Sequence, residues 1–442
     1  MPRTMTMTTP SSLTRLAVGA ALAGTLLVSA APAASADRAP LPGVTPASST
    51  AVRLPGGAET TQAVTADSRM ASALTSRVTT ARFGTSFSGA VVDVGSNATV
   101  WSRNATTARM PASTLKLVTA TNALTVFGPD ARFTTQVRTG SAANRVVLVG
   151  SGDPSLSSGG IDAMARRTAS RLIAQGITTA RVYVDDDVFP VPSLAYGWKE
   201  SYVPDSITPV RGLVRDQRDV ADTGADAGRY FRDRLKAHGI TTAGYYGRTN
   251  AAATSTRITS TTGQPVSTMV SRMLLTSDNE VAEALHKKVG IALGYGATWA
   301  GARSAQAKAL STQKLTSGTL YDGSGLSRSD RLSPLQLTRI LDRGLDPTLQ
   351  ARLWPLQSAA AMPTAGRTGT LASRFTTSQS KCAVGRLWAK TGSLSDVVSL
   401  AGFTRGADGR LKAFAFLVNG KDASTTLKNN IDMLGATVTG CY

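Results

Sequence analysis

The sequence has few of the residues from which metal sites and charge-relay triads are built. Its 442 residues include two cysteines, Cys382 and Cys441, and two histidines, His238 and His286. This set is too small for a convincing zinc site. Two histidines and the lack of a Gly-x-Ser-x-Gly elbow also disfavour a Ser-His-Asp hydrolase. The Gly-rich segment 150–154 lacks the ending of a phosphate-binding loop, so we expect no metal and no cofactor.

Acidic and aromatic residues are also scarce. The chain has 28 Asp and Glu against 48 Lys and Arg, a net charge of +20, and only 5% aromatic residues. No nucleic-acid-binding motif occurs and there are few rings on which bases could stack, so we expect no nucleic-acid partner. Outside a cell, this positive charge favours anionic wall polymers or a membrane surface. A solvated basic surface that aids solubility is the alternative.

Long apolar runs are absent except at the N-terminus. Residues 1–36 have the pattern of a secretory signal: Arg3 and Arg15, an apolar stretch at 16–31, and an A-x-A cleavage site at 34–36. An uncleaved membrane anchor is the alternative. Cleavage would remove two arginines and no acid, leaving a net charge of +18. No other run approaches the ~20 apolar residues of a membrane span, so we expect a secreted, extracytoplasmic protein.

In a secreted chain, an even pair of cysteines indicates one disulfide. A Cys382–Cys441 bond would tie the C-terminus to the region before Lys390. Closing a loop of this size could add on the order of 4 kcal/mol in the chain-entropy model. Two free thiols are the alternative.

The order of predicted elements indicates two domains, one inserted into the other. Residues 37–68 are rich in Pro, Ala, Thr and Ser without periodicity, which predicts a flexible linker. Residues 69–130 and 219–442 are assigned to the main domain. Residues 131–218 are assigned to an inserted smaller domain because short strands surround one helix there. The elements expected up to this point are a helix at 70–81, strands at 89–94, 98–102, 133–138, 145–149 and 180–185, and a helix at 160–175.

Helical patterns return after the insert, at 225–238, 266–275 and 280–289. The C-terminal part then predicts an antiparallel meander followed by a helix that covers it. Its strands are expected at 385–391, 397–404 and 411–419, separated by turns at 392–395 and 406–409. The last helix, 424–434, has an apolar stripe suited to packing on the sheet.

Ser113 and Lys116 lie three residues apart on a helix that Pro111 can begin. This spacing places both side chains on one helix face. A serine hydroxyl is a poor nucleophile until a base removes its proton, and a lysine can be that base only when neutral. Burial beside another cation could keep it neutral. A Ser-x-x-Lys pair alone occurs by chance about once in a chain of this kind, so further motifs must decide.

Two later motifs complete the pattern. Ser277-Asp278-Asn279 stands at a helix entrance, where the two outer side chains can converge from a turn; a simple helix cap is the alternative. Lys390-Thr391-Gly392 closes the first strand of the meander. Together with Ser113 and Lys116, these motifs in this order are the signatures of penicillin-recognising serine enzymes.

The sequence resembles the D-alanyl-D-alanine carboxypeptidase/endopeptidases among the low-molecular-mass, class C penicillin-binding proteins. The resemblance runs from about residue 86 to 420 and includes residues 111–116, 150–154, 322–327, 369–371, 389–392, 397–403 and 414–419. It implies an α+β fold, a penicillin-binding/β-lactamase-like transpeptidase domain whose antiparallel sheet has flanking helices, with an inserted smaller α/β domain. The family carries inserted domains after its serine helix, and the insert here is short by comparison.

The resemblance also implies a mechanism. Ser113 would attack the carbonyl between two D-alanines of a peptidoglycan stem peptide. Lys116, kept neutral by cationic neighbours, would take the proton, and Ser277 would relay it to the leaving amine. Lys390 would depress the pKa of Lys116 and orient Ser277. Peptidoglycan peptides and β-lactam antibiotics are the implied partners.

Further residues are placed around the substrate by the same resemblance. Asn279 would bind the peptide amide, and Thr391, next to Gly392, would receive the terminal carboxylate. The backbone N–H groups of Ser113 and Ser393 would hold the oxyanion.

Ser324 and Arg328 match a family loop near the substrate's side chain. For these two, a turn serine and a surface arginine are the alternatives.

Two rival functions stay open. A β-lactamase would need a fast deacylation base, and no Glu-x-x-Leu-Asn segment occurs. A non-catalytic cell-wall-binding protein on the same fold is the other, and the intact set of motifs counts against it. Persistent acylation by penicillin, as opposed to rapid turnover or no reaction, would separate the three.

Overall fold

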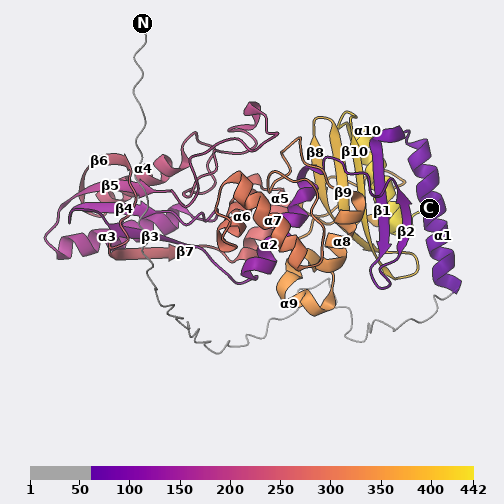
Figure 1. Ribbon diagram of the computed structural model, residues 1–442, viewed down its shortest axis with the longest axis horizontal. Helices are drawn as coiled ribbons and strands as arrows, with labels where there is room; N and C mark the ends of the chain where they lie inside the picture. Colours follow the sequence, from indigo (N-terminus) through magenta and orange to yellow (C-terminus); the bar gives the residue numbers. More distant parts are fainter. Residues whose placement is uncertain (1–60) are drawn as a thin grey trace, which may run out of the picture. The chain divides into compact units, whose positions relative to one another are not determined.

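A computed structural model describes residues 61–442, which contain two five-stranded sheets (Figure 1). The first sheet has the strand order β2-β1-β10-β9-β8, with every neighbouring pair antiparallel. Its strands are β1 (Phe87–Asp93), β2 (Thr99–Arg103), β8 (Leu387–Leu394), β9 (Val397–Arg405) and β10 (Leu411–Asn419). The predicted hairpin and the predicted meander are therefore confirmed. The predicted signal, 1–36, and residues 37–60 of the predicted linker lie outside the described residues.

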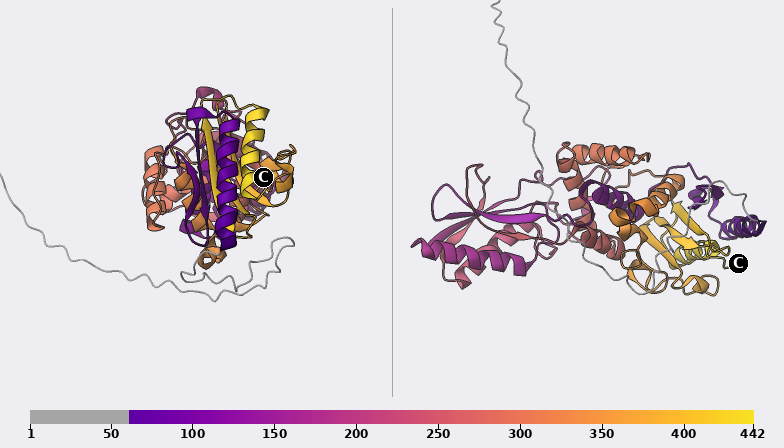
Figure 2. Two further views of the ribbon diagram at one scale, coloured as in Figure 1. Left: turned by 90° about the vertical axis from the view of Figure 1, so that its right-hand side faces the viewer. Right: turned by 90° about the horizontal axis from the view of Figure 1, so that it is seen from below.

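Helices cover both faces of this sheet, because alternate residues of its strands enter different cores. In β10, the odd-numbered residues from Ala413 to Leu417 pack in the core that includes α8 (Pro334–Gly344) and α2 (Lys116–Phe127). The even-numbered residues from Phe414 to Val418 pack against α1 (Thr61–Thr80) and α10 (Thr425–Val438). Figure 2 shows α1 and α10 side by side across the sheet.

Helix α1 begins earlier than predicted, so the predicted linker 37–68 is wrong over its last eight residues, 61–68. The cause is packing that composition does not reveal. Ala63 is buried, and Asp67 binds the buried Lys412 ammonium on β10 at 2.7 Å. A paired charge of this kind holds the first turns of α1 on the sheet.

Strand β8 is also longer than predicted. Gly392 and Ser393, expected in a turn, continue the strand and pair with Ser399 and Val398 of β9. Only residues 395 and 396 then separate the two strands. Gly392 therefore marks a close approach of another segment to the strand, and not a turn.

The second sheet forms the inserted domain and has the order β6-β5-β4-β3-β7. Helices α3 and α4 pack on it and share one apolar core with its strands. The bounds are β3 (Thr134–Thr139), β4 (Arg145–Val149), α3 (Ser158–Ala174), β5 (Thr179–Asp185), α4 (Thr223–Ala237), β6 (Thr241–Arg248) and β7 (Arg257–Thr262). The β4-β5 and β5-β6 pairs are parallel, and the other two pairs are antiparallel.

The predicted boundary of this domain at residue 218 is wrong, because α4, β6 and β7 belong to it and not to the main domain. The last two strands carry little local sign of strand structure. Strand β6 contains Gly244 and Gly247, and β7 is a run of Arg, Ser and Thr with one isoleucine. Neither shows the alternation by which half-buried strands are recognised.

Between the sheets lies a helical layer around α2, whose residues from Lys116 to Leu124 are all buried. The surrounding helices are α5 (Val266–Thr276), α6 (Asn279–Ala292), α7 (Trp299–Thr312) and α9 (Gln350–Leu353). Helix α7 was not predicted because its alanine-rich sequence has no clear apolar stripe. Within residues 61–442, no helix is long and apolar enough to span a membrane.

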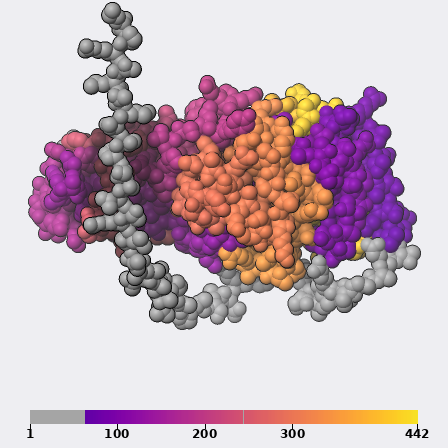
Figure 3. Space-filling view, viewed as in Figure 1, coloured from indigo at the N-terminus to yellow at the C-terminus, as the bar shows by residue number. Residues whose placement is uncertain are grey.

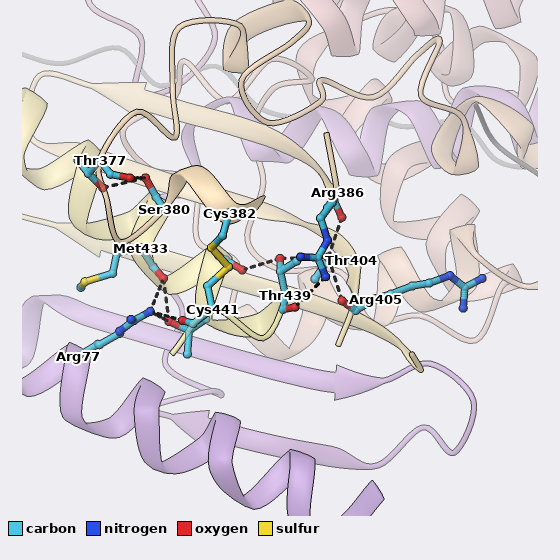
Figure 4. Close-up of a disulfide and its surroundings, with 12 residues drawn as sticks. Arg77, Thr377, Ser380, Cys382, Arg386, Thr404, Arg405, Met433, Thr439 and Cys441 are labelled. Atoms are coloured by element: carbon cyan, nitrogen blue, oxygen red, sulfur yellow. Dashed lines mark hydrogen bonds between the residues drawn. A yellow bond between two sulfur atoms is a disulfide. The ribbon is translucent and has the colours of Figure 1, made fainter. Parts of the chain in front are cut away.

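The predicted disulfide is present and joins Cys382 to Cys441, with Cα atoms 6.4 Å apart (Figure 4). It fastens the end of the chain to the segment that enters β8. Arg77 of α1 donates to the Cys441 carbonyl and to the Thr437 hydroxyl, each at 2.7 Å. The C-terminus is thus held both by a covalent bond and by α1.

Replacing both cysteines by serine should lower the free energy of unfolding. The two residues are 59 apart, and the chain-entropy model gives about 4 kcal/mol for a loop of that length. Urea unfolding of the double variant and the oxidised wild type measures the difference. Wild-type protein refolded under reducing conditions is the control and should match the variant. Equal unfolding midpoints for all three would contradict the prediction.

Candidate active site

The candidate nucleophile, Ser113, lies in a tight 3₁₀ turn, Ala112–Leu115, that leads directly into α2. Ala112 has φ +47°, a left-handed conformation that costs a residue with a side chain about 1–3 kcal/mol. The Ser399 hydroxyl of β9 donates to the Pro111 carbonyl at 2.7 Å and holds the start of the turn. The strain is maintained by the structure packed around the turn.

Two glycines allow that packing. A Cβ at Gly392 of β8 would lie 2.7 Å from the Pro111 oxygen, and a Cβ at Gly325 would lie 2.0 Å from the Ala112 oxygen. Gly325 also has φ +85°. The serine turn is therefore clamped between the edge of the sheet and the loop 322–328, with no room for a side chain at either point.

Lys116 lies one turn after Ser113 and is fully buried. Its Nζ is 3.0 Å from Ser113 Oγ, 2.7 Å from Asn279 Oδ1 and 2.7 Å from the Ser324 carbonyl oxygen. The last two atoms can only accept hydrogen bonds. A neutral amine has two N–H groups and one lone pair, so when both N–H groups are used in this way the lone pair faces the Ser113 hydroxyl. The amine is arranged to accept the serine proton.

Burial lowers the pKa of Lys116 to about 8, and the carboxylates of Asp322, Glu283 and Asp278 oppose that shift. The expectation that neighbouring cations keep Lys116 neutral thus needs correction, because loss of water is the main cause. Burial also lowers the pKa of Lys390 well below its usual range, and the nearby Lys116 lowers it further. Of the two lysines, Lys390 is therefore the one whose pKa is lowered by the charge of the other.

The three side chains of the Ser277-Asp278-Asn279 segment have different contacts. Helix α5 ends at Thr276, and Ser277 adopts φ +64°. Asp278 caps α6 by accepting from the Val281 N–H at 3.0 Å. The cap considered as the alternative therefore exists, but Asp278 provides it.

The other two side chains of the segment reach the buried lysines. Ser277 Oγ lies 3.0 Å from Lys390 Nζ, and Asn279 Oδ1 accepts from Lys116. The left-handed conformation of Ser277 bends the chain between α5 and α6, which lets both side chains face the same site.

Lys390 is buried in β8 and also donates to its neighbour's carbonyl, that of Thr391, at 2.8 Å. The Thr391 hydroxyl donates to the Thr370 hydroxyl at 2.8 Å. Thr370 belongs to the 369–371 segment of the resemblance. Ser393 follows on the same strand and is exposed. Direct contacts thus join Ser113, Lys116 and Asn279 in one group and Ser277 and Lys390 in another. The two groups are close enough for the charge of Lys116 to act on Lys390, and Thr391 lies next to Lys390.

Ser324 and Arg328 are placed differently from each other. The Ser324 hydroxyl is buried within its own loop, where it accepts from the Leu326 N–H at 3.3 Å; its carbonyl is the atom that meets Lys116. The side chain of Arg328 is partly exposed and forms an ion pair with Asp396 at 2.8 Å. Of the two, only Arg328 presents a side chain that a bound molecule could meet.

Part of the inserted domain packs against the helical layer beside this region, where magenta atoms meet orange ones in Figure 3. The Trp198 indole N–H donates to Asp322 at 2.7 Å, and Asn279 Nδ2 donates to the Ser206 carbonyl at 2.8 Å. Ser327 Oγ donates to the Tyr196 carbonyl at 2.7 Å. Segment 196–206 therefore contacts both the Asn279 amide and the loop 322–328. No motif in segment 196–206 predicts these contacts.

Gly325→Ala should destabilise the fold because it adds a Cβ against a backbone oxygen and imposes a positive φ on alanine. We expect a loss of at least about 2 kcal/mol in the free energy of unfolding, measured by urea titration. Gly159→Ala is the matched control: Gly159 lies in α3, an added Cβ would be no closer than 3.9 Å to any neighbouring atom, and the gain in helix propensity should be about 1 kcal/mol or less. Equal stability of the Gly325 variant and the wild type would refute the clamp.

Comparison with known proteins agrees with this geometry. The family model described as D-Ala-D-Ala carboxypeptidase 3 (S13) matches residues 70–216 and 203–438. A carboxypeptidase of Mycobacterium tuberculosis is 31% identical over 80% of both chains. Carboxypeptidase DacB of Mycolicibacterium smegmatis is 32% identical, also over 80% of both chains.

Among solved structures, penicillin-binding protein 4 of Haemophilus influenzae superposes with a TM-score of 0.71. It is 20% identical in sequence, and the match covers 83% of this chain and 98% of that one. This likeness bears out the predicted α+β fold. The family match extends over most of the described chain and includes the serine turn and both later motifs. The chain therefore belongs to the D-Ala-D-Ala carboxypeptidase 3 (S13) family of serine peptidases.

Proposed function

We propose that this serine-type D-Ala-D-Ala peptidase acts outside the cytoplasm on peptidoglycan stem peptides, through an acyl-enzyme on Ser113 that β-lactams also form. The observation that carries the proposal is the Lys116 amine. It is fully buried, lies 3.0 Å from Ser113 Oγ, and has two acceptors for its N–H groups. A lysine held in this way can act as a general base for a serine nucleophile.

In the acylation step, Ser113 Oγ attacks the carbonyl carbon of the D-Ala–D-Ala bond while its proton passes to the Lys116 amine. The backbone N–H groups of Ser113 and Ser393 hold the oxyanion; losing one such donor would cost on the order of 3 kcal/mol. The C–N bond then breaks, and the leaving amine takes a proton through Ser277. Ser277 is suited to this relay because its hydroxyl lies 3.0 Å from Lys390 Nζ and it is two residues from Asn279.

Deacylation reverses the proton transfers. Water attacks the Ser113 ester, the shortened peptide leaves with a free carboxylate, and the proton returns to the serine oxygen. The Thr391 hydroxyl receives the terminal carboxylate of the substrate, and its hydrogen bond to the Thr370 hydroxyl at 2.8 Å supports this role. Asn279 binds the peptide amide, and Arg328 lies at the partly exposed side, where the substrate's side chain would extend.

Two observations favour this function over its rivals. Among the described residues, no carboxylate is hydrogen-bonded to Ser113 or Lys116, which leaves a β-lactamase without an evident deacylation base. A protein that only binds the wall would have no use for two buried lysine amines, whose removal from water is costly. The disulfide supports an extracytoplasmic location. The net positive charge supports attraction to anionic wall polymers.

Labelled benzylpenicillin should modify the wild type at a single peptide that contains Ser113, located by mass spectrometry. Ser113→Ala should abolish the label because, among residues 61–442, no other hydroxyl is hydrogen-bonded to the Lys116 amine. Ser304→Ala, on the exposed side of α7, is the control and should be labelled at the wild-type rate. A Ser113→Ala protein that still takes the label, or a wild type that hydrolyses penicillin rapidly without accumulating it, would refute the assignment.

The acylation rate should rise with pH because Lys116 acts as a base only when deprotonated. With a pKa of about 8, the neutral fraction falls about tenfold per pH unit below that value. The rate at pH 6 should therefore be roughly one hundredth of the plateau reached above pH 9. Stopped-flow acylation by a chromogenic β-lactam measures the profile. A rate that is constant from pH 6 to 9 would exclude titration of the base in this range.

A further inference from the structure

We infer that Glu283, which belongs to none of the motifs, is a positioning residue: it orients the loop 322–328 so that the Ser324 carbonyl accepts from Lys116, and its charge acts on that amine. The inference rests on the proposed role of Lys116 as the base. Glu283 lies one turn after Asn279 on α6, on the same helix face, and is fully buried.

The Glu283 carboxylate accepts from two successive backbone N–H groups of the loop. Ser324 N–H donates to Oε1 at 2.8 Å, and Gly323 N–H lies at 3.1 and 3.0 Å from the two oxygens. A buried carboxylate that accepts backbone N–H groups forms strong, directional bonds. Glu283 therefore fixes the first half of the loop from the α6 side.

Asp322 fixes the second half in the same way. It is also fully buried, and it accepts from Gly325 N–H and Ser327 N–H, each at 2.8 Å. With four loop N–H groups directed at two carboxylates, two loop carbonyls face α2. The Gly323 oxygen accepts from the Thr119 hydroxyl at 2.6 Å, and the Ser324 oxygen accepts from Lys116 at 2.7 Å.

The loop has no room to move without disturbing the site. A Cβ at Gly323 would lie 2.6 Å from the Cβ of His286 on α6, and one at Gly325 would lie 2.0 Å from the Ala112 oxygen. The loop is thus a tight spacer between α6 and the serine turn. Loss of the Glu283 contacts would displace the Ser324 carbonyl. Because this carbonyl accepts from Lys116, its displacement would change the direction of the Lys116 lone pair.

The charge of Glu283 acts on the amine as well. Ionised Glu283 raises the pKa of Lys116, whereas burial and the neighbouring Asp322 raise the pKa of Glu283 itself. Loss of this negative charge makes it easier for Lys116 to become neutral. The charged groups that act on this pair are Asp278, Lys287, Asp322, Asp330 and Lys390.

Glu283→Gln separates the effect of the charge from that of the hydrogen bonds. Its amide oxygen can still accept both loop N–H groups, whereas the negative charge is removed. The acid limb of the acylation rate should move to lower pH by roughly half to one unit, with a plateau within about threefold of the wild type. Glu283→Ala loses the acceptor, and its plateau should fall more than about tenfold. Recovery of the plateau in the glutamine variant would assign that loss to the missing hydrogen bonds.

Glu280→Gln is the matched control. Glu280 is also on α6, and burial raises its pKa to about 7, but its carboxylate accepts from Thr208 of the inserted domain and not from the loop 322–328. Its acid limb should coincide with that of the wild type. An unmoved or upward-shifted limb in Glu283→Gln would overturn the inference, as would equal shifts in both glutamine variants.

A second readout does not depend on catalysis. The titration of the Lys116 ε-carbon resonance, in protein labelled with carbon-13 lysine and assigned with Lys116→Arg, should show the same downward shift in Glu283→Gln. If the wild type took no β-lactam label, the proposed function would fail, yet this titration would still decide the inference. An unchanged Lys116 titration would overturn it even in a fully active enzyme.

Discussion

The direction of a single lone pair constrains the whole site. A neutral lysine amine accepts the proton of a serine through its one lone pair, and acceptors for its two N–H groups direct that lone pair and satisfy the buried donors. Lys116 has Asn279 Oδ1 and the Ser324 carbonyl for this purpose. One acceptor comes from the entrance of α6 and the other from the loop 322–328. Three distant stretches of sequence must therefore meet at one buried nitrogen.

The sheet supplies the rigid side of this arrangement. Strand β9 is buried from Val397 to Thr404, with cores on both faces, and β8 pairs with it along its length. Because Gly392 has no side chain, the serine turn can lie directly against this edge, where Ser399 holds it. A strained turn needs such a backing, since its left-handed Ala112 would otherwise relax. The rigidity of the sheet is thus transmitted to the nucleophile.

Local patterns predicted what depends on local chemistry, and contacts between distant segments decided the rest. The three motifs, the meander and the disulfide could be predicted because each has its own spacing or residue type. The end of the linker could not, since it depends on Asp67 meeting Lys412, 345 residues away. The end of the insert depends on β6 and β7, which lack alternation. Glu283 could have been predicted from the sequence as a residue near the site, because it stands four residues after Asn279 on the same helix.

The inserted domain is tied to the chemistry by Ser206 and Trp198, which bind the Asn279 amide and the Asp322 carboxylate. Asn279 contacts Lys116 directly, and Asp322 holds the loop whose Ser324 carbonyl contacts Lys116, so this domain supports the candidate site as well as forming its own core. Excising it, or grafting it from a relative, would remove the Ser206 carbonyl from the Asn279 amide and the Trp198 indole from the buried Asp322 carboxylate. Exchange of inserted domains between family members should consequently succeed only when segment 196–206 stays with the peptidase domain that it contacts.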